Sequence, residues 1–157
     1  MMHQAYVMLG SNIDPVENTR RALALLAEWV RLLAVSNCWE TGSVGYDGPN
    51  FINVAVLAET ALDREDLKTQ VLASIEKQLG RVRSANKNAP RTIDLDIVVF
   101  DGQVVDQNLW ERAHVAAPMA ELLPDLRHPQ SGQTLKEAAT ELQASAYAVP
   151  RPELQIT

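Results

Sequence analysis

Residues 91–100 run Arg91-Thr92-Ile93-Asp94-Leu95-Asp96-Ile97-Val98-Val99-Phe100 (RTIDLDIVVF), and this pattern predicts a β-strand from residue 92 to residue 100. Side chains two residues apart on a strand share a face, so Asp94 and Asp96 are expected to project together. The opposite face would carry the apolar side chains Ile93, Leu95, Ile97 and Val99, directed toward a core.

The segment before this strand predicts a helix over residues 63–79. Leu67, Val71, Ile75 and Leu79 recur every fourth residue and form one apolar stripe. Asp63 places negative charge at the start of the helix, and Gly80 is a typical C-terminal stop.

The rest of the chain alternates strands and helices. A strand over residues 4–9 leads through the turn 10–12 into a helix from Pro15 to about Val30, with Asp14 as its cap and Glu17 at the capping-box position. Further strands are expected over 32–41 and 51–57, and further helices over 118–123 and 134–142, with 151–157 as a tail.

This order predicts an α+β fold, namely a ferredoxin-like βαββαβ sandwich with a mainly antiparallel sheet and appended C-terminal helices. A length of 157 residues fits one domain over 1–157. Twenty acidic against fourteen basic side chains give a net charge of -6, which argues against a nucleic-acid binder.

The sequence carries no apolar run of about 18 residues and no secretory signal pattern, so we expect no membrane association and a cytoplasmic location. Cys38 is the single cysteine, which suits a reducing compartment. We expect a monomer that acts on small molecules.

The Asp94–Asp96 pair is the first candidate for chemistry. Two neighbouring carboxylates on a strand repel each other, and a divalent cation offsets that cost well, since Mg²⁺ takes one or two carboxylates together with water and phosphate oxygens. The alternative is a solvated face whose aspartates pair with nearby basic side chains.

Residues 81–91 (RVRSANKNAPR) concentrate positive charge in an otherwise acidic protein. They hold the four cations Arg81, Arg83, Lys87 and Arg91 and no acidic residue. Arginine forks match phosphate oxygens, so a metal site beside this segment predicts phosphoryl transfer. The alternative is a surface loop whose arginines contact the two aspartates directly.

Other features are less specific. The glycine-rich residues 42–51 could form a pocket wall for a flat heterocycle, or a plain connection. His3, His114 and His128 lack the spacing of a zinc site. Gly10-Ser11-Asn12 is interpreted as a strand-to-helix turn rather than a phosphate loop, because the lysine of such loops is missing.

Several motifs together resemble one family. They are residues 6–12 (YVMLGSN), 51–56 (FINVAV), 80–83 (GRVR) and 90–96 (PRTIDLD), with 111–113 and 118–126 further on. In this order they resemble the 6-hydroxymethyl-7,8-dihydropterin pyrophosphokinases. The resemblance implies transfer of pyrophosphate from ATP to a pterin alcohol, with release of AMP, in folate biosynthesis.

The resemblance also implies roles for particular residues. Asp94 and Asp96 would hold two Mg²⁺ ions, and Glu76 would orient an arginine. The catalytic group would be Arg81, Arg83 and Arg91. The ATP-binding group would be Arg81, Arg83, Lys87, Arg91, Ile97 and Arg112. The pterin-binding group would be Thr41, Ser43, Val44, Gly45, Phe51, Asn53 and His114.

Two alternatives stay open. Residues 101–110 are shorter than the family pattern and hold no histidine, so the chain could be a weakened or non-catalytic paralogue that binds pterin or nucleotide. The pair Phe51 and His114 could instead select another heterocyclic alcohol for phosphotransfer.

Overall fold

The computed structural model describes residues 1–43, 48–80 and 93–157. Its sheet is built around strand β1 (His3–Ser11), which lies between β4 (Phe51–Thr60) and β5 (Asp94–Phe100) and pairs antiparallel with both. Strands β2 (Arg31–Val35) and β3 (Cys38–Thr41) follow one another along the far edge of β4. The short strands β6 (Gln103–Val104) and β7 (Ala148–Arg151) extend the sheet beyond β5 and β3.

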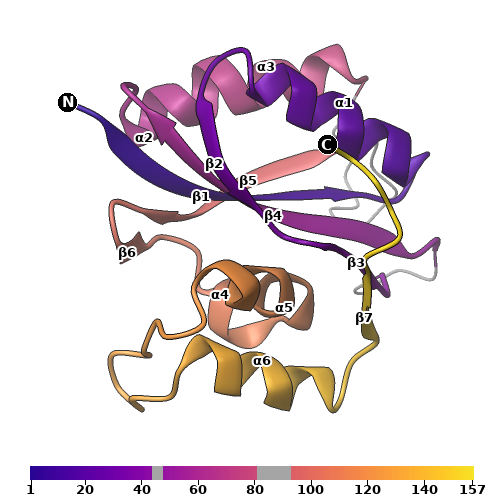
Figure 1. Cartoon of the computed structure of the whole chain (residues 1–157), viewed down its shortest axis with the longest axis vertical. Helices are drawn as coiled ribbons and strands as arrows, with labels where there is room; N and C mark the ends of the chain where they lie inside the picture. The colour runs from indigo at the N-terminus through magenta and orange to yellow at the C-terminus, as the bar shows by residue number, and fades with distance from the viewer. Residues whose placement is uncertain (44–47, 81–92) are drawn as a thin grey trace.

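Helices cover both faces of this sheet (Figure 1). Helix α1 (Pro15–Leu26) and the helical run α2 (Arg64–Asp66), η1 (Leu67–Leu72) and α3 (Ala73–Gln78) lie on one face. Helices α4 (Asn108–Glu111), α5 (Ala113–Leu122) and α6 (Leu135–Gln143) lie on the other. The order β1-α1-β2/β3-β4-α2/η1/α3-β5 is the predicted βαββαβ arrangement with C-terminal helices appended.

Each face has its own apolar core. The core under α1 and α3 contains the fully buried side chains Leu9, Leu26, Leu67, Ile75 and Ile93, and the core under α4–α6 contains Val98, Leu109, Met119 and Leu135. The helical stripe predicted from Leu67, Val71, Ile75 and Leu79 is confirmed as core. Among the described residues, no helix combines the length and apolar character that a membrane crossing requires.

Three helix starts agree with the sequence. Pro15 is the first residue of α1, the Asp63 carboxylate accepts the backbone N–H of Asp66, and Thr134 and Glu137 form the predicted capping box of α6. The prediction that the Asp14 side chain caps α1 is wrong. Asp14 adopts a left-handed backbone conformation with φ 42°, and its side chain makes no cap hydrogen bond.

Several predicted boundaries are also wrong. Helix α1 ends at Leu26 rather than Val30, and α5 begins at Ala113, with Pro118 inside it rather than at its start. The strand predicted over 32–41 is split at Ser36, whose backbone N–H and hydroxyl bond the carbonyl and N–H of Ala55 in place of regular pairing.

A β-bulge in β5 makes the predicted assignment of side chains to the two faces of this strand wrong at Val99. Tyr6 pairs with Val99 and Val7 with Ile97, so Val98 is an extra residue in β5. The alternation therefore changes there: Ile93, Leu95 and Ile97 face the core under α1 and α3 as predicted, whereas Val99 packs into the other core.

The prediction that residues 151–157 form a tail is contradicted by the structure. Arg151 belongs to β7 and is paired with Cys38, while Leu154 packs against the core under α1 and Ile156 is buried in it. Apolar burial at the last residues holds this end of the chain against the sheet.

Candidate active site

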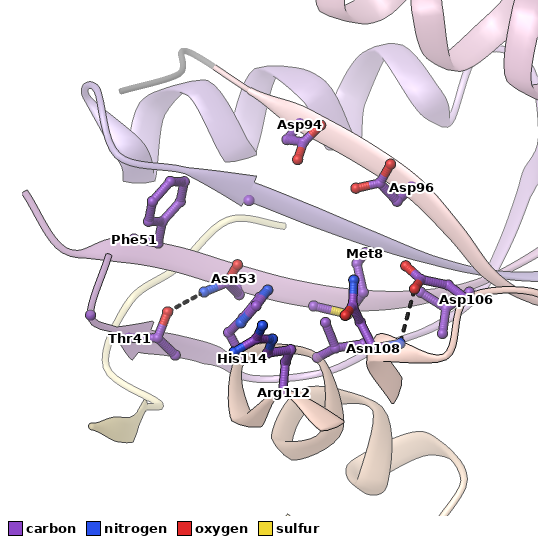
Figure 2. Close-up of a pocket in the computed structure, with 14 residues that line it drawn as sticks. Met8, Thr41, Phe51, Asn53, Asp94, Asp96, Asp106, Asn108, Arg112 and His114 are labelled. Carbon is purple, nitrogen blue, oxygen red and sulfur yellow. Dashed lines mark hydrogen bonds between the residues drawn. The ribbon is translucent and has the colours of Figure 1, made fainter. Parts of the chain in front are cut away.

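A cavity of about 290 Å³ opens on the sheet face that carries α4 and α5 (Figure 2). Strands β1, β3, β4 and β5 supply one side, and the residues around α4 and α5 supply the other. Its lining residues are Met8, Gly10, Thr41, Gly42, Phe51, Asn53, Asp94, Asp96, Val98, Asp106, Asn108, Arg112, His114 and Val115.

The strand register places two kinds of polar side chain on either side of one glycine. Gly10 on β1 pairs with Asn53 on β4 and with Asp94 on β5. The carboxylates Asp94 and Asp96 therefore lie on one flank of Gly10, and the carboxamide of Asn53 lies on the other. An acidic half and an amide half share one cavity.

The acidic half confirms that Asp94 and Asp96 share a face, because both line the cavity. Partial burial, together with repulsion from Asp94, Glu76 and Asp106, raises the pKa of Asp96 to about 7. Excess negative charge of this kind is stabilised by a bound cation.

Two oxygen-donor side chains fit Mg²⁺, which takes one or two carboxylates and completes its shell with water and phosphate. The parts of the chain that the structure describes contain no cluster of three or more His, Cys, Asp or Glu side chains able to hold a metal by themselves. The two carboxylates of Asp94 and Asp96 fit a hard cation that takes its remaining ligands from water and a bound phosphate.

Glu76 holds the strand that carries the two aspartates of the acidic half. Its carboxylate is buried, with 6% of the residue exposed, and Oε2 accepts the backbone N–H of Leu95 at 2.9 Å. Leu95 stands between the two aspartates, on a stretch of β5 that pairs with β1, while β6 pairs only with Val99 and Phe100. Glu76 therefore fixes the backbone that carries Asp94 and Asp96, a contact that the sequence does not reveal.

The amide half is organised around Asn53. Its Nδ2 donates to the Thr41 hydroxyl at 2.6 Å, and both residues are buried. Phe51, which pairs with Thr41 across β3 and β4, adds an aromatic ring to the same wall. Ser43 is half-buried, and its hydroxyl donates to the Pro49 carbonyl at 2.7 Å. It does not line the cavity, so its contact with the pterin stays a prediction.

The helical wall brings Arg112 and His114 to the cavity. Arg112 lies between α4 and α5, and His114 is in the first turn of α5. Figure 2 shows both on the opposite side of the cavity from the aspartates of β5. A cation and an aromatic ring therefore face the sheet.

The structure brings together seven residues that the sequence analysis singles out, namely Thr41, Phe51, Asn53, Asp94, Asp96, Arg112 and His114. Ile97 is not among the lining residues and packs against the core under α1 and α3, so its contact with ATP stays a prediction. The predictions for Val44, Gly45, Arg81, Arg83, Lys87 and Arg91 lie outside the described residues.

Six lining residues are not predicted as part of the site: Met8, Gly10, Val98, Asp106, Asn108 and Val115. Gly10 is the last but one residue of β1 rather than part of a turn. A glycine inside a strand often marks a close approach of another group, and this signal could have identified it. Asp106 lies in the connection between β6 and α4, and Asn108 is the first residue of α4, so the positions of both depend on tertiary packing.

The fold and the cavity define a ferredoxin-like α+β protein with a ligand site that is acidic on one flank and amide-lined on the other. The chain matches the family model 7,8-dihydro-6-hydroxymethylpterin-pyrophosphokinase (HPPK) over residues 6–124. It therefore belongs to the HPPK family.

Relatives agree with this assignment. The chain is 38% identical over 156 residues to the 2-amino-4-hydroxy-6-hydroxymethyldihydropteridine pyrophosphokinase of Methylorubrum extorquens, covering 92% of this chain and 96% of that protein. It is 31% identical over 165 residues to the protein of the same name from Synechocystis, covering 98% and 84%. It is 38% identical to the folic acid synthesis protein fol1 of Schizosaccharomyces pombe, covering 88% of this chain but 20% of that much longer protein.

Among solved structures, the chain resembles wild-type Plasmodium falciparum HPPK-DHPS with pteroate. The TM-score is 0.68 at 11% identity, covering 90% of this chain and 42% of that chain. This likeness shows the fold.

Proposed function

We propose that this protein transfers pyrophosphate from ATP to 6-hydroxymethyl-7,8-dihydropterin and releases AMP, as a step of folate biosynthesis. The observation that carries the proposal is the division of one cavity into a carboxylate flank and an amide and aromatic flank, with Gly10 between them. Such a cavity can hold a metal-bound polyphosphate beside a flat heterocycle.

Asp94 and Asp96 would hold Mg²⁺, and the family resemblance implies two ions. When bound, Mg²⁺ neutralises charge on the polyphosphate and lowers the barrier to its transfer. The residues present fit this role, because Asp94 and Asp96 supply two carboxylates to one cavity wall and repulsion from neighbouring acidic groups raises the pKa of Asp96.

The amide flank would bind the pterin. Phe51 and His114 would stack against the ring, and Asn53, held by Thr41, would hydrogen-bond its polar edge. Ser43, Val44 and Gly45 are proposed to contribute contacts beside this ring. A buried polar group of fixed orientation rejects a ring that cannot pair with it, which would make Asn53 selective.

Positive side chains would bind the nucleotide. Arg112 lines the cavity and can pair with phosphate oxygens. Arg81, Arg83, Lys87 and Arg91 are proposed for the same polyphosphate from their sequence pattern, with the three arginines stabilising the transferred group, and Ile97 is proposed as a further nucleotide contact.

The reaction forms one bond and breaks another. The hydroxymethyl oxygen of the pterin attacks the β-phosphorus of ATP, the bond from this phosphorus to the α-phosphate oxygen breaks, and AMP leaves with that oxygen. The proton of the hydroxymethyl group passes to solvent. The protein contributes by aligning the two substrates across Gly10, which converts a bimolecular encounter into an oriented one.

The test is formation of AMP from ATP, Mg²⁺ and hydroxymethyl-dihydropterin by the full chain. We expect stoichiometric AMP and pterin pyrophosphate, and a loss of at least about 100-fold in kcat for Asp96→Ala, equivalent to several kcal/mol of transition-state stabilisation. Asp125→Ala is the matched control, because Asp125 is exposed and outside the cavity.

Binding of pterin without release of AMP would favour the non-catalytic paralogue, and AMP release only with other heterocyclic alcohols would favour a different phosphotransferase. Unchanged turnover in Asp96→Ala would refute the metal role.

We also propose that the enzyme works as a cytoplasmic monomer and with small molecules alone. The acidic net charge of -6 and the single buried thiol support this proposal. Sedimentation of the purified chain at one molecular mass would agree with it, and a concentration-dependent dimer would refute it.

A further inference from the structure

We propose that Gly10 is a positioning residue for the substrate heterocycle: its missing side chain makes room for the Asn53 carboxamide and holds the oxygen of that amide toward the cavity. The inference rests on the proposed function for the identity of the ring, but its structural part does not depend on it.

The first observation is a distance. A Cβ built on Gly10 would lie 2.8 Å from Oδ1 of Asn53, closer than real Cβ contacts come. The next nearest atoms are Cγ of Asn53 and Cδ1 of Phe51, both at 3.9 Å. The three nearest atoms thus belong to the proposed ring-binding wall, so any side chain at residue 10 would collide first with Asn53.

The backbone does not account for the glycine. The glycines with positive φ in the described parts of the chain are Gly80, Gly102 and Gly132, and Gly10 is not one of them. Its conformation is that of an ordinary strand residue within β1. Space beside Asn53 is therefore the physical reason for glycine at residue 10.

The second observation fixes the direction of the amide. Nδ2 of Asn53 donates to the Thr41 hydroxyl at 2.6 Å, and Asn53 is only 4% exposed. With the nitrogen committed to Thr41, the oxygen lies on the Gly10 side of the group. Asn53 therefore presents an acceptor to the cavity, which suits a ring edge that carries N–H donors.

A methyl group at residue 10 leaves two responses. The Asn53 amide can rotate and lose its bond to Thr41, or β1 and β4 can separate. Their continuous antiparallel register from His3↔Thr60 to Ser11↔Ile52 opposes the second response. Rotation of the amide is expected, and the acceptor then leaves the direction in which the ring needs it.

Gly10→Ala is the perturbation, with Asn53→Ala, the double variant and Thr41→Val beside it. Gly10→Ala should weaken pterin binding and raise the KM for pterin by about tenfold, the effect of losing one buried hydrogen bond, with the KM for ATP changed less than about twofold. In the Asn53→Ala background, which removes the colliding oxygen, Gly10→Ala should add less than about twofold.

A control separates this effect from general destabilisation. Gly102 has a φ of 81° and nothing lies within 4 Å of a Cβ added there, so Gly102→Ala strains the backbone at a residue that does not line the cavity. It should lower the melting temperature and leave the KM for pterin unchanged.

The side-chain amide resonance of Asn53 in NMR spectra provides a readout without turnover. It should shift in Gly10→Ala and in Thr41→Val. An unshifted resonance in Gly10→Ala would overturn the inference. So would a Gly10→Ala substitution that lowers pterin affinity equally in the wild-type and in the Asn53→Ala backgrounds. A wild-type chain that makes no AMP while Gly10→Ala shifts this resonance would refute the proposed function and leave the role of Gly10 standing.

Discussion

Replacing Glu76 by alanine should destabilise the strand that carries the two aspartates. The carboxylate accepts the N–H of Leu95 at 2.9 Å in a buried setting, and Leu95 stands between Asp94 and Asp96. The variant removes the carboxylate that accepts this N–H, and the free energy of unfolding should fall by ~2–3 kcal/mol, the contribution of a charge-assisted buried hydrogen bond. A chain of this size then loses ~4–12 °C in melting temperature.

One effect acts in the opposite direction. Glu76 is among the charges that raise the pKa of Asp96, so its removal also relieves repulsion. At about pH 6 the Asp96 carboxyl, with a pKa of about 7, is mostly protonated, and this relief contributes little. The loss of stability should therefore be measured near pH 6.

The assay is chemical denaturation of the metal-free chain at about pH 6. Glu76→Gln keeps a neutral acceptor and should lose less than half as much free energy of unfolding as Glu76→Ala, because neutral hydrogen bonds contribute about 0.5–1.5 kcal/mol. Glu65→Ala, at an exposed residue of α2 at the start of the same helical run, is the control and should change little. A Glu76→Ala variant within about 0.5 kcal/mol of wild type would refute the supporting role of Glu76.

Three further predictions follow from other contacts. The pKa of Asp96 is raised from 3.8 to about 7, so ionisation of this carboxyl opposes folding increasingly as pH rises through that range. Melting curves of wild type and Asp96→Asn should diverge between about pH 4 and 7 without Mg²⁺, with Asp96→Asn the more stable; parallel curves would contradict this account. Cys38 is 2% exposed and burial raises the pKa of its thiol, so a thiol reagent should modify it only at the rate of unfolding, and rapid labelling of the native chain would argue against that burial. Arg151→Met removes the ion pairs with Glu40 on β3 and with Glu153 and should lower the melting temperature only slightly, because both pairs are partly exposed. Glu153→Gln, which leaves the Arg151–Glu40 pair intact, should cost less, and equal losses would count against a role for Glu40.

The sequence predicts much of this fold because its local signals agree with the tertiary structure. The capping box of Thr134 and Glu137, the stripe from Leu67 to Leu79 and the shared face of Asp94 and Asp96 all appear in the structure. Each depends on neighbours within one helix or strand, where periodicity is sufficient.

The features that the sequence misses depend on partners distant along the chain. The bulge at Val98 is a property of the pairing between β1 and β5, and burial of Ile156 needs the core under α1. The role of Gly10 becomes visible only when Asn53 is placed opposite it. Alternation and propensity describe one strand at a time and do not contain these contacts.

The most direct measurement is a crystal structure of the full chain with Mg²⁺, an unhydrolysable ATP analogue and the pterin. We predict Mg²⁺ bound by Asp94 and Asp96 and by phosphate oxygens, with the ring against Asn53 and Phe51 on the other flank of Gly10. A polyphosphate bound away from β5, with both carboxylates paired to guanidinium groups and no ion between them, would contradict the account.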